Sequence, residues 1–160
     1  MIEVISEVYM RIRGIIDEPA IMTILWVLAS LIAWTTKVRL VSPQEKHFLL
    51  WLIGISGLVL YPATLGLSMW DPYRYGYDPV GLLAVYGCIA LWTAVRGYWA
   101  SLCMLLAATL AFAFQLKTSI NYWDYLLDPM LVIYSWFALL RLGYGRAYSG
   151  RSPEVRARVR

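Results

Sequence analysis

Long apolar runs separated by short charged stretches are the feature that most constrains the fold of this chain. Five runs can be delimited, at about residues 20–36, 47–67, 80–95, 98–116 and 125–140. A helix needs roughly 17–25 apolar residues to cross a bilayer, and the first, second and fourth runs are long enough. Only 15% of the residues are charged, against about 25% in soluble domains. A soluble domain of 160 residues could not bury the 61% that are hydrophobic. The sequence therefore predicts an all-α integral membrane protein, a bundle of about five transmembrane helices.

The chain divides into three expected parts. Residues 1–18 place apolar side chains at three- and four-residue spacing, which is typical of an amphipathic helix lying in the membrane interface or against a partner. Residues 19–142 are expected to form the transmembrane helical bundle. Residues 143–160 combine Gly, Ser, Pro and Arg, which favours a basic flexible C-terminal tail.

The distribution of basic residues predicts an orientation. Lys37, Arg39 and Lys46 follow the first run, Arg96 follows the third, and arginines crowd the C-terminal tail, whereas the loops between them are net acidic. Because Lys and Arg are retained on the cytoplasmic side, we expect the N-terminus outside and the C-terminus inside. Without the fifth run the arginine tail would lie outside, so we retain that short run as a span. No cleavable signal peptide is visible, and we expect a multi-pass protein of a bacterial inner membrane.

An acidic residue followed by proline precedes each span that would enter from outside. These dipeptides are Glu18-Pro19, Asp78-Pro79 and Asp128-Pro129. An acidic N-cap accepts hydrogen bonds from free backbone N–H groups, and proline fits the first helical position. We therefore predict three helix starts capped by their own carboxylates.

Two outer loops carry the residues from which a site could be built. Both contain Trp-Asp, a tyrosine one or two residues after that Asp and then Asp-Pro, which concentrates carboxylates and aromatic rings near one membrane surface. Arg74, or else Lys117, is the expected partner of Asp128, because an ionised carboxylate below the interface needs one. The candidate binding residues are Trp70, Asp71, Tyr73, Arg74, Asp78, Trp123, Asp124 and Asp128.

Three interpretations of this outer face remain open. It could be an aromatic belt with acidic helix caps and a structural Asp–Arg pair. It could be a recognition surface for a partner subunit, a glycan or a lipid, since Tyr and Trp offer apolar faces with polar tips. It could also be a catalytic or divalent-cation site made of carboxylates.

Several chemistries are not supported by the sequence. His47 is the only histidine, and Cys88 and Cys103 lie within apolar runs with no metal-ligand spacing. Gly-rich phosphate loops and serine nucleophile motifs are absent, and no charged residue lies in the middle of a span, as a proton-coupled transporter would need. We therefore expect no cofactor, no metal and no nucleic-acid partner, and we assign no catalytic residue.

These observations favour a small non-catalytic accessory subunit of an inner-membrane complex. The outward aromatic and acidic face would contact a larger membrane protein, a second copy of the chain or an envelope component, while lipids surround the bundle. The rival hypothesis is a small membrane enzyme, or a lipid- or glycan-handling protein, that uses the outer-face aspartates.

Overall fold

A computed structural model describes residues 18–67 and 69–149, so the predicted N-terminal amphipathic segment lies almost wholly outside the described residues. The described chain contains six α-helices, one 3-10 helix and no strand. The all-helical prediction is therefore confirmed for this part of the chain. The elements are α2 (Ile21–Thr36), α3 (Pro43–Thr64), η1 (Pro72–Gly76), α4 (Val80–Val95), α5 (Trp99–Ala113), α6 (Trp123–Leu126) and α7 (Pro129–Ser149).

The helix ends follow from local sequence chemistry. In α3, Ser42 and Glu45 form a capping box in which the side chain of each accepts the backbone N–H of the other, and Pro43 occupies the first turn. At the end of α4, Gly97 has φ +70° and the Tyr98 N–H donates to the Thr93 carbonyl. This left-handed termination lets α4 and α5 connect through a very short turn.

The ends of α5 and α7 differ from the predicted runs. In α5 the left-handed position is taken by Gln115 (φ +48°), and the helix ends at Ala113 rather than near Leu116. The predicted fifth span was to begin at residue 125, and this boundary is wrong. Residues 123–126 form the separate helix α6, and Leu127 is extended. The backbone then enters α7 at Pro129 and stays helical to Ser149, within the segment assigned to the tail.

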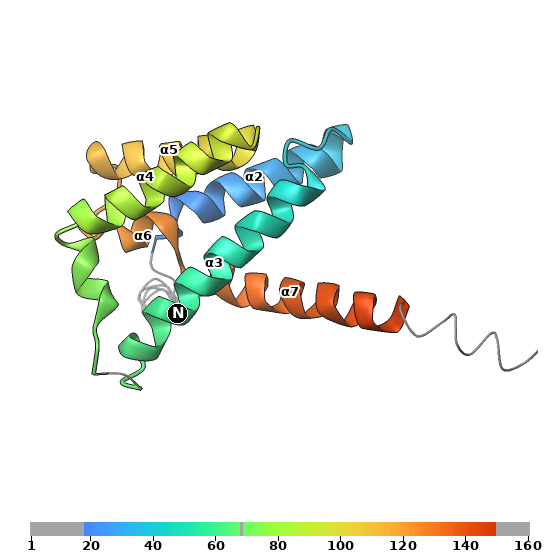
Figure 1. Cartoon of the computed structure of the whole chain (residues 1–160). Coiled ribbons are helices and arrows are strands. Elements are labelled where there is room, and N and C mark those ends of the chain that lie inside the picture. Colours follow the sequence, from blue (N-terminus) through green and yellow to red (C-terminus); the bar gives the residue numbers. More distant parts are fainter. Residues whose placement is uncertain (1–17, 68, 150–160) are drawn as a thin grey trace, which may run out of the picture.

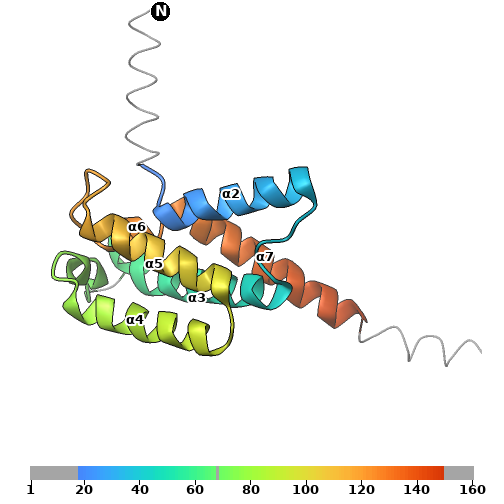
Figure 2. The same ribbon diagram turned by 90° about the horizontal axis from the view of Figure 1, so that it is seen from above.

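The long helices run alternately in opposite directions, so the connections gather at two ends (Figures 1 and 2). The α2–α3 and α4–α5 connections lie at one end, and η1, α6 and the start of α7 lie at the other. Helix α5 packs on α4 and α2, and α3 packs on α7. We refer to the end that contains η1 and α6 as the η1–α6 end and to the opposite one as the basic end.

The α3–α7 contact depends on glycines in α3. A Cβ atom at Gly57 would lie 2.3 Å from Val132 Cγ1, so only glycine allows this approach of the two helices. One turn away, Trp136 Nε1 donates a 3.0 Å hydrogen bond to the Gly54 carbonyl. Such close approach at small residues is common where helices pack without large side chains between them.

The core lies toward the η1–α6 end. Helix α6 packs against α2 and α5, and the apolar side chains of α6 and its flanks are buried. Tyr122 and Tyr125 are among the largest side chains with no exposed surface. Their rings make edge and tilted contacts with Phe112 and Tyr86. The aromatic side chains in and next to α6 therefore form the packing contacts that join the longer helices at this end.

Among the described residues, one helix is long and apolar enough to cross a membrane, the Pro43–Ala63 stretch of α3. The apolar parts of α2, α4, α5 and α7 are shorter. For example, the 16 residues of α4 extend over about 24 Å, less than the ~30 Å hydrocarbon thickness of a typical bilayer.

Candidate functional site

The two loops singled out in the sequence interlock at the η1–α6 end. The Tyr122 N–H donates to the Gly76 carbonyl at 2.9 Å, and Trp123 Nε1 donates to the Pro72 carbonyl at 3.0 Å. The buried Asn121 amide donates to the Tyr73 carbonyl at 3.0 Å. These bonds join segments about fifty residues apart into one rigid platform, which we call the loop platform (residues 70–78 and 117–128).

Gly76 is required where the loops meet. A Cβ atom on this residue would lie 1.7 Å from Asn121 Oδ1 and 2.8 Å from Trp123 Cδ1. The same Asn121 oxygen accepts the Trp123 N–H at 2.9 Å, so it cannot move away without breaking a buried hydrogen bond.

Asp124 lies at the centre of the loop platform. Its carboxylate accepts hydrogen bonds from the Tyr73 hydroxyl at 3.0 and 3.1 Å and from the Ser119 hydroxyl. Partial burial of the Tyr73 ring and, next, the charge of Asp124 raise the pKa of the Tyr73 hydroxyl above its ordinary value, because both disfavour a phenolate. The hydroxyl thus stays protonated and remains a donor.

Lys117 connects the loop platform to the entry of α2. Its ammonium donates to the Glu18 carbonyl at 2.6 Å and to the Asp124 carbonyl at 2.9 Å. It also lies 5.8 Å from the centroid of the Tyr125 ring. The lysine was considered as a partner for the Asp128 carboxylate, but it binds backbone carbonyls instead.

Asp128 caps two helices at once. One carboxylate oxygen accepts the Leu131 N–H of α7 at 2.7 Å, and the other accepts the Ala20 N–H at the start of α2 at 3.0 Å. Both helix N-termini present positive dipole ends to this negative charge. The predicted pairing of Asp128 with Arg74 is wrong, because oriented backbone N–H groups satisfy the carboxylate.

The other two acid–proline dipeptides do not act as predicted. In α4 the N-cap is Pro79, with no side-chain hydrogen bond, and the Asp78 side chain is exposed. In α2 the N-cap is Ala20, also without a side-chain cap of its own. Asp128, which is distant in sequence, supplies the carboxylate oxygen at the start of α2 instead of the neighbouring Glu18. A tertiary contact therefore replaces the cap that the local sequence predicted.

The remaining predicted site residues lie on the exposed edge of the loop platform. Asp71 caps η1 by accepting the Tyr73 N–H at 3.0 Å. The Arg74 guanidinium lies 5.9 Å from the centroid of the Tyr75 ring, which in turn lies 6.3 Å from the Trp70 ring. Trp70 and Tyr75 are about half exposed. Tyr73, Trp123 and Asp124 are therefore brought together, whereas Trp70 and Arg74 form a separate aromatic–cation edge with Tyr75.

Sequence reasoning missed one carboxylate at the opposite end. Glu45 is 6% exposed, and besides its bond to the Ser42 N–H it accepts the backbone N–H groups of Ala100 and Ser101 at 3.0 and 3.4 Å. It thus caps α3 and α5 together, as Asp128 caps α7 and α2. The Ser42-x-x-Glu45 spacing is a recognisable capping-box signal, but its second helix could not be read from the sequence.

Within the described residues, no group of three or more His, Cys, Asp or Glu side chains is arranged to hold a metal ion. Comparison of the chain with protein-family models, curated proteins and solved structures gives no match. The function is therefore argued from the fold and from these contacts.

Proposed function

We propose that this chain is a multi-pass membrane protein that serves as a non-catalytic accessory subunit of a bacterial inner-membrane complex. The observation that supports membrane insertion is the apolar outer surface of the bundle. Large apolar side chains cover it on every long helix, including Trp34 (72% exposed), Leu91 (67%) and Val95 (80%). Apolar surface on this scale is unfavourable in water and is typical of contact with lipid or with another protein.

Short spans are compatible with this proposal. Helices of about 24 Å are accommodated in a bilayer by local thinning and by flanking side chains that reach toward the interface, at a modest cost per ångström. The basic end carries Lys37, Arg39, Lys46 and Arg96, and the loop platform carries most of the aspartates. This asymmetry supports an orientation with the basic end in the cytoplasm.

The accessory role is supported by the use that the fold makes of its carboxylates. The oxygens of Asp124 accept Tyr73 and Ser119 hydroxyls, and those of Asp128 accept two backbone N–H groups. A general acid or base must instead reach a substrate. We therefore favour the subunit over the rival hypothesis of a membrane enzyme or lipid- or glycan-handling protein that uses these aspartates.

The exposed edge of Trp70, Arg74 and Tyr75 is the surface that we propose for partner contact. Aromatic and arginine side chains are the residue types enriched at the centres of protein interfaces. The edge rests on the rigid loop platform, so it would lose little conformational entropy on binding.

The test is purification of the tagged chain from its native membrane in mild detergent, with identification of proteins that accompany it stoichiometrically. A variant with Trp70→Ala, Arg74→Ala and Tyr75→Ala should lose the partner and still accumulate. Trp34→Ala, which truncates an exposed aromatic residue of α2, is the matched control and should retain it. A chain that purifies alone, or a partner that survives the triple change, would overturn the accessory role at this edge. Recovery of the chain in the soluble fraction would overturn membrane insertion.

A further inference from the structure

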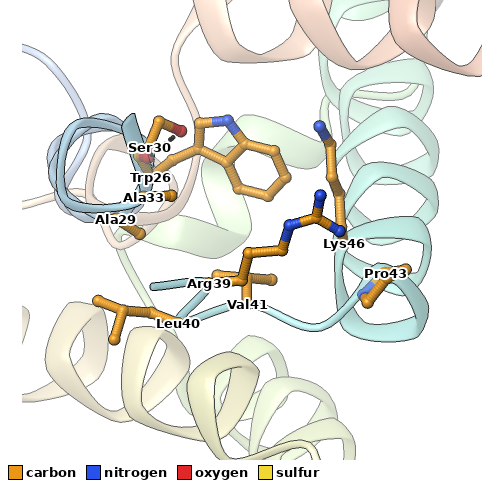
Figure 3. A pocket seen from close by; sticks show the side chains of 9 residues that line it. All are labelled: Trp26, Ala29, Ser30, Ala33, Arg39, Leu40, Val41, Pro43 and Lys46. Carbon is orange, nitrogen blue, oxygen red and sulfur yellow. Dashed lines mark hydrogen bonds between the residues drawn. The ribbon is translucent and has the colours of Figure 1, made fainter. Parts of the chain in front are cut away.

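A pocket of about 410 Å³ opens at the basic end, between α2, α3 and their connection (Figure 3). Helix α2 contributes Trp26, Ala29, Ser30 and Ala33, the connection contributes Arg39, Leu40 and Val41, and α3 contributes Pro43 and Lys46. Its volume falls in the range of about 300–1,000 Å³ that is typical of small-molecule sites.

Two cationic side chains line this pocket, and no carboxylate of the described residues pairs with either of them. Figure 3 shows Arg39, Lys46 and the indole ring of Trp26 lining the same pocket. The acidic neighbour in sequence, Glu45, directs its oxygens to the backbone N–H groups that it caps in α3 and α5. Two positive charges that line one pocket repel each other, and an anion bound in the pocket would relieve that repulsion.

An apolar groove continues directly from the pocket. It also measures about 410 Å³, shares Ala29, Leu40 and Val41 with the pocket, and runs between α2 and α5. Its other lining residues are Leu25, Trp99, Ala100, Cys103, Met104 and Ala107. A bound molecule would therefore meet two cations at one end and a continuous apolar wall at the other.

We propose that this composite site binds one anionic phospholipid of the cytoplasmic leaflet. Its phosphate lies between Arg39 and Lys46, and one acyl chain follows Leu40 and Val41 into the α2–α5 groove. A guanidinium and an ammonium are the usual protein partners of phosphate, and basic pockets between helices on the cytoplasmic side suit anionic headgroups. The inference rests on the membrane insertion and orientation proposed above, but it is independent of the partner subunit.

The test measures lipid binding to the full chain purified in a zwitterionic detergent. Native mass spectrometry would follow retention of phosphatidylglycerol and, for comparison, of phosphatidylcholine with the same acyl chains. We expect wild type to prefer phosphatidylglycerol. The double variant Arg39→Gln, Lys46→Gln should bind it about 30-fold more weakly, since each interfacial cation contributes about a factor of five.

Matched variants distinguish the pocket from general surface charge. Lys37→Gln with Arg96→Gln removes the same charge from the same end but does not touch the pocket lining; it should leave the preference unchanged. Ala29→Leu keeps every charge and fills the point shared by the pocket and the groove, so it should weaken binding of the lipid and spare binding of glycerophosphate.

Three results would overturn the proposal. The first is an equal loss of binding in the Lys37→Gln, Arg96→Gln control, which would indicate a diffuse basic face. The second is wild-type binding without preference between the two lipids. The third is competition by inorganic phosphate as effective as that by the whole lipid, which would indicate a free phosphate ligand. These measurements use the purified chain, so their outcome does not depend on whether a partner subunit co-purifies with it.

Discussion

Replacing Asp128 with alanine should remove capping interactions from two helices at once. The carboxylate accepts one backbone N–H of α7 at 2.7 Å and one at the entry of α2 at 3.0 Å. Loss of an N-cap side chain costs about 0.5–2 kcal/mol, so the free energy of unfolding should fall by roughly 1–4 kcal/mol. Asp128→Asn keeps one acceptor oxygen and loses the charge at the helix dipoles, and it should cost about half as much.

The assay is reversible unfolding of the purified chain in mixed detergent micelles, followed by far-ultraviolet circular dichroism. Asp78→Ala is the matched control. It makes the same substitution in another Asp-Pro dipeptide, Asp78-Pro79, where the helix N-cap has no side-chain hydrogen bond. It should change the free energy of unfolding by less than about 0.5 kcal/mol. The reasoning is refuted if the two alanine variants are equally destabilised, or if Asp128→Asn costs as much as Asp128→Ala.

Three further predictions concern the loops. Gln115→Gly should stabilise the protein by about 0.5–1 kcal/mol in the same assay, because glycine adopts φ +48° without strain; destabilisation would contradict this. Gly76→Ala should cost more than about 2 kcal/mol, because its Cβ would overlap Asn121, whereas Gly81→Ala, which meets no atom within 4 Å, should be neutral or stabilising; equal effects would refute the close approach. The raised pKa of Tyr73 predicts stability that is present below pH 10 and lost as pH rises toward the folded-state value; Tyr73→Phe should reduce this alkaline loss in unfolding measured from pH 9 to 12, and an unchanged profile would contradict it.

The two double caps have a structural consequence for the whole bundle. Glu45 ties the starts of α3 and α5 together at the basic end, and Asp128 ties α7 to α2 at the η1–α6 end. Each carboxylate satisfies backbone donors that would otherwise be free at helix N-termini. In a low-dielectric surrounding such charge-assisted bonds are stronger than at an aqueous surface, so two residues can position four helices.

What the sequence determined by itself is the local structure. The third apolar run predicted residues 80–95, and α4 has these bounds. The Asp128 cap of α7 was also predictable, because its acceptor and donor lie three residues apart and proline follows the acid. Helix formation and capping within one turn depend on neighbouring residues, and for that reason a single sequence reveals them.

Only the tertiary structure decided which distant groups meet. The bond from Ala20 to Asp128 spans 108 residues, and that from Tyr73 to Asp124 spans 51. The spacing of apolar and charged residues along the chain does not predict these hydrogen bonds, because they depend on how α6 packs against the long helices. The sequence identified Arg74, or else Lys117, as the partner of Asp128 from charge alone, yet the carboxylate accepts hydrogen bonds from two backbone N–H groups instead. Local chemistry thus determines which groups need partners, and three-dimensional contacts between helices determine which partners they obtain.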